Sequence, residues 1–146
     1  DYYHEYFSEK GLYENEVYLG VPDLLASLKQ AGKQLIVATS KPEEFSIQIL
    51  KHFGLYDYFD FVAGATMDRK RSKKSDVIQY ALEQNGITDL AHTIMIGDRE
   101  HDVLGAQAQK FDSIGVLYGF GSREELEEAG ATYIAQEVGE IAAFIG

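Results

Sequence analysis

Short runs of consecutive apolar residues alternate with segments of helical periodicity along this 146-residue chain. The apolar runs lie in residues 33–40, 59–66, 92–98, 113–119 and 132–135, and the helical segments cover residues 21–32, 41–54, 73–86, 99–109, 123–130 and 138–145. Strands that are apolar throughout, rather than at alternate positions, are typical of strands buried on both faces. The alternation therefore predicts an α/β fold: a doubly wound parallel sheet, a Rossmann-like core, with helices on both faces and right-handed crossovers.

The composition fits one globular domain and excludes several functional classes. Hydrophobic residues make up 45% of the chain and charged residues 25%, which is ordinary for a globular protein. No apolar run approaches the ~18 residues of a membrane span, and there is no secretion-signal pattern. The absence of cysteine excludes disulfides and thiol catalysis. We therefore expect a cytoplasmic protein with no membrane partner. The net charge of −11 argues against a nucleic-acid partner, and the oligomeric state stays open.

Two aspartates follow the apolar run that ends at Gly97, in the sequence IMIGDREHD. Asp98 is expected at the end of a strand and Asp102 in the first turn of the next helix. Carboxylates at the carboxyl end of a parallel strand suit a hard cation such as Mg²⁺, which prefers oxygen ligands. The alternative is structural: Asp98 caps the helix and Asp102 complements its dipole.

Two further strand ends carry polar side chains. Thr39 and Ser40 follow the apolar run LIVA and precede a helix, where backbone N–H groups favour an anion. The basic run RKRSKK at residues 69–74 places Lys73 and Lys74 before or within the first turn of a helix, where a positive charge opposes the helix dipole. Thr39 and Ser40 could instead cap a helix, and the basic run could be a solvated loop. Because parallel strand ends meet at one crevice, we expect these groups and the two aspartates to meet there.

The N-terminal residues have a different pattern. Tyr2, Tyr3, Tyr6 and Phe7 are spaced for one apolar face of a helix, so we expect a short aromatic helix over residues 2–10 that ends at Gly11.

The ordered set of LIVATSKP, RSKKSDVI and IMIGDREHDVLGA closely resembles the second, third and fourth motifs of the haloacid dehalogenase superfamily of phosphohydrolases. The segments GVPDLLASLKQAG and GVLYGFGSREELEEAGATYI are similar to the branch that contains phosphoglycolate phosphatase and bacterial 5′-nucleotidases. The resemblance covers nearly the whole chain.

The resemblance implies a role for each matching residue. Thr39 would hydrogen-bond the transferring phosphoryl group, and Ser40 would orient the phosphate through its backbone. Lys74 would neutralise phosphate charge, with Lys73 as the alternative lysine. Asp98 would bind Mg²⁺, and Asp102 would support the metal shell or hold the lysine. The substrate would be a small phosphorylated metabolite.

One family motif is missing. The resemblance implies an Asp-x-Asp pair after an N-terminal strand, which supplies the nucleophile and the general acid, but no such pair precedes Thr39. We therefore expect residues 1–15 to be the end of a helical cap domain and residues 16–146 to be a core that lacks its first strand. A longer parent protein would hydrolyse phosphate monoesters through an aspartyl-phosphate, and this chain alone would be inactive. A phosphomutase and a non-catalytic module that binds phosphate or metal are the alternatives.

Overall fold

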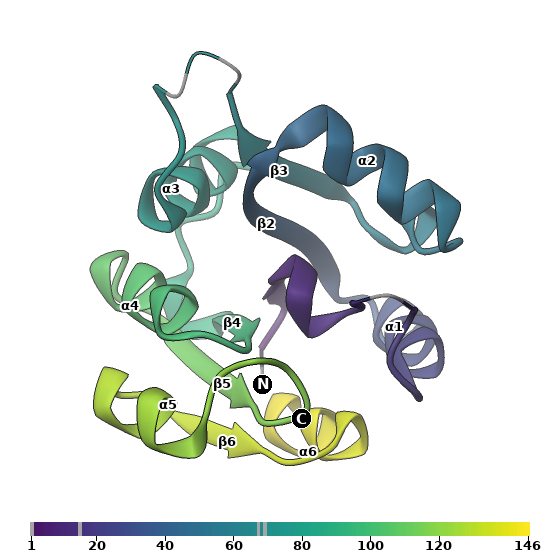
Figure 1. Ribbon diagram of the computed structural model, residues 1–146, viewed down its shortest axis with the longest axis vertical. Helices are drawn as coiled ribbons and strands as arrows, with labels where there is room; N and C mark the ends of the chain where they lie inside the picture. Colours follow the sequence, from purple (N-terminus) through teal and green to yellow (C-terminus); the bar gives the residue numbers. More distant parts are fainter. Residues whose placement is uncertain (1, 15, 67, 69) are drawn as a thin grey trace.

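The computed structural model describes residues 2–14, 16–66, 68 and 70–146; Arg69, the first residue of the predicted basic run, lies outside them. The fold is a six-stranded sheet with the strand order β3-β2-β1-β4-β5-β6, and every neighbouring pair is parallel. The strands are β1 His4–Phe7, β2 Gln34–Pro42, β3 Phe61–Ala65, β4 Thr93–Gly97, β5 Asp112–Val116 and β6 Tyr133–Ala135. The predicted doubly wound parallel sheet is thereby confirmed (Figure 1).

Six helices cover the two faces of the sheet (Figure 1). They are α1 Val21–Gln30, α2 Glu43–His52, α3 Lys74–Gln84, α4 Glu100–Ala108, α5 Arg123–Ala129 and α6 Val138–Ile145. One apolar cluster joins the sheet to α1, α2 and α6, and a second joins it to α3 and α4. Because both faces are covered, the middle strands are buried on both sides, as their apolar sequences require. Within the described residues, no helix combines the length and the apolar character needed to cross a bilayer.

The helix predicted for residues 2–10 is wrong. His4–Phe7 is a strand at the centre of the sheet, between β2 and β4, and only Glu9–Gly11 forms a short 3-10 turn. Tyr6 packs into the cluster with α3 and α4, whereas Phe7 packs into the opposite cluster. The spacing of the aromatic residues does not mark one face of a helix, because in the strand these residues lie on both faces of the sheet. A gap between β2 and β4 would leave two rows of backbone groups unpaired, and the segment fills that gap.

This strand buries a carboxylate at an unfavourable place. Glu5 is fully buried, and neither of its carboxylate oxygens has a hydrogen-bond partner within the described residues. Burial raises the pKa of Glu5 to about 8, although the charge of nearby Lys33 acts in the opposite direction. The central strand is therefore held by backbone pairing and aromatic packing despite a side chain that burial penalises.

From residue 21 onward, the predicted helices and strands all occur, with small shifts at their ends. In α2, Phe45 is 52% exposed. The helix buries Ser46 and Leu50, and the Ser46 hydroxyl donates a hydrogen bond to the Glu9 carboxylate.

Candidate active site

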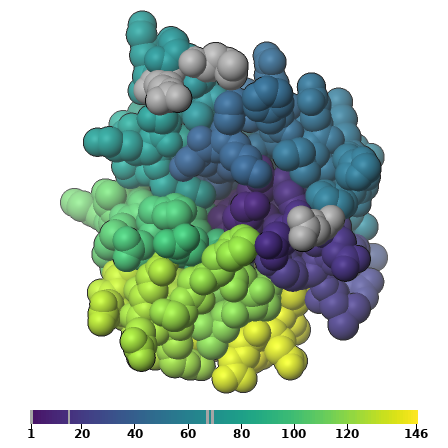
Figure 2. Space-filling view, viewed as in Figure 1, coloured from purple at the N-terminus to yellow at the C-terminus, as the bar shows by residue number. Residues whose placement is uncertain are grey.

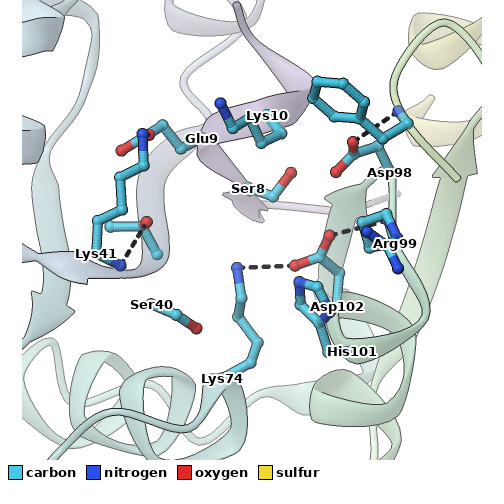
Figure 3. A pocket seen from close by; sticks show the side chains of 12 residues that line it. Ser8, Glu9, Lys10, Ser40, Lys41, Lys74, Asp98, Arg99, His101 and Asp102 are labelled. Atoms are coloured by element: carbon cyan, nitrogen blue, oxygen red, sulfur yellow. Dashed lines mark hydrogen bonds and ion pairs between the residues drawn. The ribbon is translucent and has the colours of Figure 1, made fainter. Parts of the chain in front are cut away.

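A pocket of about 340 Å³ opens at the carboxyl edge of the sheet, where the strand order reverses between β1 and β4. The five residues predicted for the site all line it: Thr39, Ser40, Lys74, Asp98 and Asp102. Figure 3 shows the side chains of Ser40, Lys74, Asp98 and Asp102 around one space. The five residues come from β2, α3, α4 and the turn after β4. In the space-filling view, purple N-terminal residues lie in the middle of the same face, between blue and green ones (Figure 2). The convergence of the three strand ends follows from the parallel topology.

Lys74 and Asp102 form a buried ion pair on one side of the pocket. The Lys74 Nζ lies 2.7 Å from Asp102 Oδ1 and donates a hydrogen bond of 2.9 Å to the carbonyl oxygen of Ala38. Lys73, the alternative lysine, is exposed and precedes α3. Asp102 Oδ2 also accepts a hydrogen bond from the backbone N–H of Arg99, at 3.3 Å. Asp102 therefore holds the lysine and the start of α4 at once.

Gly97 allows this pair to form. A Cβ atom at Gly97 would lie 2.4 Å from the Cβ of Asp102, far inside van der Waals contact. A glycine at the end of β4 is therefore what lets the first turn of α4 pack against the strand.

Asp98 lies on the other side of the pocket and is almost fully buried, at 1% exposed. Its Oδ2 accepts a hydrogen bond of 2.9 Å from the backbone N–H of Phe120, in the loop after β5. Burial raises the pKa of Asp98, and the Asp102 carboxylate adds to that rise, whereas the Phe120 N–H and the Lys74 charge lower it. The alternative that Asp98 caps α4 does not hold, because no side-chain hydrogen bond of Asp98 to the helix is formed.

Thr39 ends the buried part of β2 and faces the pocket. It is 3% exposed, and its Oγ1 accepts a hydrogen bond of 3.1 Å from the backbone N–H of Lys41. The Thr39 hydroxyl hydrogen finds no acceptor among the described residues, so it remains available to a ligand. Ser40 is exposed at the pocket wall. Neither residue caps α2, which begins after Pro42 without a side-chain cap.

Glu9 also lines the pocket, although no sequence motif indicated it. One carboxylate oxygen, Oε1, lies 2.7 Å from Lys41 Nζ, and the other, Oε2, accepts a hydrogen bond of 2.7 Å from the Ser46 hydroxyl. In Figure 3 the Glu9 side chain lies beside Lys41 and away from Asp98. Both oxygens are thus occupied, and Glu9 does not present a free carboxylate to the Lys74–Asp98 space.

Other residues at the pocket were also missed. Lys10, Arg99 and Phe120 line it, and the Lys10 Nζ lies 5.6 Å from the centre of the Phe120 ring. The signal for Phe120 was the glycine on either side of it, because Gly119 and Gly121 let this loop approach Asp98 closely. Lys10 gave no signal, since its segment was expected to be helical. His101 is exposed beside the site.

The acidic side chains can hold part of a metal shell. No group of three or more His, Cys, Asp or Glu side chains suited to a metal occurs in the chain outside residues 1, 15, 67 and 69. Mg²⁺ is commonly bound through one or two carboxylates together with waters and substrate phosphate. The buried Asp98 carboxylate, with Asp102 nearby, fits such a partial shell.

Comparison with known proteins identifies relatives. A 5′-nucleotidase of Pseudomonas aeruginosa is 41% identical over 94% of this chain and 62% of that protein. The tyrosine-protein kinase PtkA of Mycobacterium tuberculosis is 39% identical over 88% of this chain and 44% of that protein. A phosphoglycolate phosphatase of Neisseria meningitidis is 35% identical over 74% of this chain and 46% of that protein.

A solved structure agrees. The crystal structure of a predicted phosphatase from Clostridium acetobutylicum superposes with a TM-score of 0.86 at 54% sequence identity, over 88% of this chain and 59% of that one. The chain thus spans between 44% and 62% of the length of these relatives. The sequence model of the haloacid dehalogenase-like hydrolases matches residues 1–116. On this evidence, the chain belongs to the haloacid dehalogenase-like hydrolase family.

Proposed function

We propose that this chain is the core of a Mg²⁺-dependent phosphatase that hydrolyses small phosphate monoesters. The observation that carries the proposal is the gathering of a threonine hydroxyl, a buried lysine and two buried aspartates around one pocket of about 340 Å³. Phosphoryl transfer requires mainly positioning and charge neutralisation of this kind. The names of the 5′-nucleotidase and phosphoglycolate phosphatase relatives support the same reaction class.

Each side chain has a role in the proposal. The Thr39 hydroxyl donates to a phosphoryl oxygen, and the backbone of Ser40 orients the phosphate. Lys74, fixed by Asp102 and the Ala38 carbonyl, neutralises the charge of the phosphoryl group. Asp98 and, through its second oxygen or a water, Asp102 would hold Mg²⁺, which supplies charge neutralisation when bound.

The proposal places the nucleophile on a segment outside this chain. Among the described residues, Glu9 is engaged by Lys41 and Ser46, and the two aspartates are committed to the metal and the lysine. We propose that a longer protein supplies an aspartate on a strand between β2 and β4, which forms the aspartyl-phosphate. Residues 1–15 would then belong to a cap domain and residues 16–146 to the core. The buried Glu5, whose carboxylate has no hydrogen-bond partner in the described part of the chain, supports this division, because β1 fits the central position poorly.

The proposal extends to the cellular setting. The absence of cysteine favours a cytoplasmic protein, and the net charge of −11 disfavours a nucleic-acid partner.

The direct test is an assay of the full-length protein that contains this chain. Inorganic phosphate would be measured after incubation with nucleoside 5′-monophosphates and with 2-phosphoglycolate, with Mg²⁺ and with a chelator in its place. We expect release that depends on Mg²⁺. The absence of Mg²⁺-dependent release from every substrate tried would contradict the proposal.

Assays of the same full-length protein distinguish the alternative functions. A phosphomutase would move phosphate between positions of a sugar phosphate without net release. A phosphotransferase, as the name of the PtkA relative suggests, would label a tyrosine from radioactive ATP. A binding module would show calorimetric heat with Mg²⁺ and phosphate but no turnover.

A further inference from the structure

The turn that carries Asp98 is held from outside the pocket by a helix that was not predicted to take part in the site. Glu125, in the first turn of α5, uses one oxygen, Oε2, for two hydrogen bonds. The Arg99 Nε donates to it at 2.8 Å, and the backbone N–H of Glu100 donates to it at 2.7 Å. One carboxylate thus binds both residues that follow Asp98.

The Glu125 carboxylate does not make the capping hydrogen bond that its position in the helix favours. A serine followed three residues later by a glutamate is typical of a capping box, in which the glutamate accepts from the backbone N–H of the serine. Here Ser122 Oγ accepts from the Glu125 N–H at 3.1 Å, which forms one half of the box. The Glu125 carboxylate instead contacts the 98–100 turn. Helix stability alone therefore does not account for its orientation.

The loop that leads into α5 presses on Asp98 from a second direction. A Cβ atom at Gly121 would lie 2.0 Å from the Asp98 carbonyl oxygen, and one at Gly119 would lie 2.4 Å from the Asp98 Cβ. The Phe120 N–H between these glycines binds the Asp98 carboxylate. The loop and Glu125 therefore hold the same turn, one at Asp98 and the other just after it.

We propose that Glu125 is a positioning residue for the metal-binding end of the site. By fixing the backbone of Glu100 and the guanidinium of Arg99, it keeps the Asp98 carboxylate directed into the pocket and Arg99 at the pocket mouth. This inference rests on the proposed function, because the metal-binding role of Asp98 belongs to that proposal. Carboxylates and hydrogen bonds behind metal ligands affect metal affinity by about 10-fold to 100-fold.

The test compares three variants of the full-length protein. Glu125→Ala removes both hydrogen bonds, and Glu125→Gln keeps one acceptor oxygen without the charge. Glu124→Ala is the matched control, because Glu124 lies in the same helical turn and is exposed. Two quantities are measured in each: the exchange protection of the Glu100 amide by NMR, and the dissociation constant for Mg²⁺ by calorimetry.

We expect Glu125→Ala to lower the protection of the Glu100 amide and to raise the Mg²⁺ dissociation constant about tenfold. In Glu125→Gln, the amide protection and the Mg²⁺ dissociation constant should lie between those of Glu125→Ala and wild type. In Glu124→Ala, both should match wild type. If the rate at saturating Mg²⁺ stays within about threefold of wild type while the Mg²⁺ requirement rises, the effect is on metal binding.

Two results would overturn the inference: unchanged Glu100 protection in Glu125→Ala, or a Mg²⁺ affinity in Glu125→Ala equal to that of Glu124→Ala. A wild-type protein that binds no Mg²⁺ would instead refute the proposed metal site, and with it the role of Glu125 there. The amide measurement distinguishes the two failures, because it reports on the turn whether or not metal binds.

Discussion

At the scale of single residues, Asp98 is the side chain on which the proposed metal site depends most. Its burial raises its pKa, and a buried carboxylate is tolerated when a cation or donors compensate it. The Phe120 N–H supplies one donor, and the proposed metal would supply the charge.

Replacing Asp98 by Asn should lower the Mg²⁺-dependent rate of the full-length protein by at least about 100-fold, since a neutral amide is a poor Mg²⁺ ligand. The amide oxygen can still accept from Phe120, so the fold should persist. Steady-state kinetics at several Mg²⁺ concentrations would show the change. Asp57→Asn, at an exposed position, is the control. Equal rates in the two variants would remove Asp98 from the proposed site.

Lys73 and Lys74 are neighbours in the sequence, but Lys74 is buried and Lys73 is exposed. Lys74→Met leaves the Asp102 carboxylate buried without its partner at 2.7 Å, and breaking such a pair costs about 3–5 kcal/mol. Lys73→Met removes the same charge from an exposed residue and should change the free energy of unfolding by less than about 0.5 kcal/mol. Urea denaturation of both variants measures the difference. Similar unfolding free energies would mean that the Lys74–Asp102 pair does not form as described.

Glu5 gives the fold a dependence on pH. Burial raises its pKa from 4.5 to about 8, so the folded chain binds an extra proton between these values. The free energy of unfolding should be highest below about pH 4.5 as far as this group is concerned. It should then fall as the pH rises toward about 8 and level off above it, with a total change on the order of 5 kcal/mol.

In the 146-residue chain, Glu5→Met should remove this dependence and raise stability at pH 8. Glu44→Met, at an exposed position of α2, should keep the wild-type dependence. Urea denaturation at pH 5, 6.5 and 8 measures it. A wild-type profile that Glu5→Met leaves unaltered would show that Glu5 is not buried in this way.

At the scale of elements, the strand ends and the glycines beside them shape the site. The loop between β5 and α5 approaches Asp98 so closely that it requires glycine, and β4 meets α4 through Gly97. These contacts place α4, α5 and the loop after β5 around the turn that carries Asp98.

Gly119→Ala should disturb Asp98 directly, because the added Cβ would lie 2.4 Å from the Asp98 Cβ. We expect a loss of about 1–3 kcal/mol in unfolding free energy together with weaker Mg²⁺ dependence. In Gly139→Ala the new Cβ meets nothing within 4 Å, and in helix α6 the change should stabilise by about 0.5–1 kcal/mol. Chemical denaturation of the two variants tests this contrast. A Gly119→Ala variant with the wild-type unfolding free energy and Mg²⁺ dependence would mean that the loop does not hold Asp98.

At the scale of the whole molecule, the central position of the sheet is the one that we propose a different strand occupies in the longer protein. In this chain β1 fills it and completes both ladders. In the longer protein that we propose, a different strand takes this position and residues 1–15 lie in a cap.

The substitution at Glu5 tests that division as well. In the full-length protein, Glu5 would lie outside the sheet, so Glu5→Met should leave the pH dependence of stability unchanged. The same effect in the full-length protein as in this chain would show that β1 keeps its central place and would contradict the division.

The sequence by itself predicted the class of fold and the residues that meet at one pocket. Continuous apolar strands and amphipathic helices are local patterns, so they predicted five of the six strands, all six helices and the meeting of Thr39, Lys74, Asp98 and Asp102 at one edge. These residues follow strand ends, and parallel topology brings strand ends together whatever the details of packing.

The tertiary structure alone decided what local periodicity cannot encode. The aromatic residues of His4–Phe7 fit a helix or a strand equally well in isolation, and the unpaired edges of β2 and β4 selected the strand. The burial of Lys74 rather than Lys73 beside Asp102, and the hydrogen bonds between Glu125 and the turn after Asp98, likewise depend on which partner lies within hydrogen-bond distance. Such partners are far apart in the sequence, and only the folded chain brings them into contact.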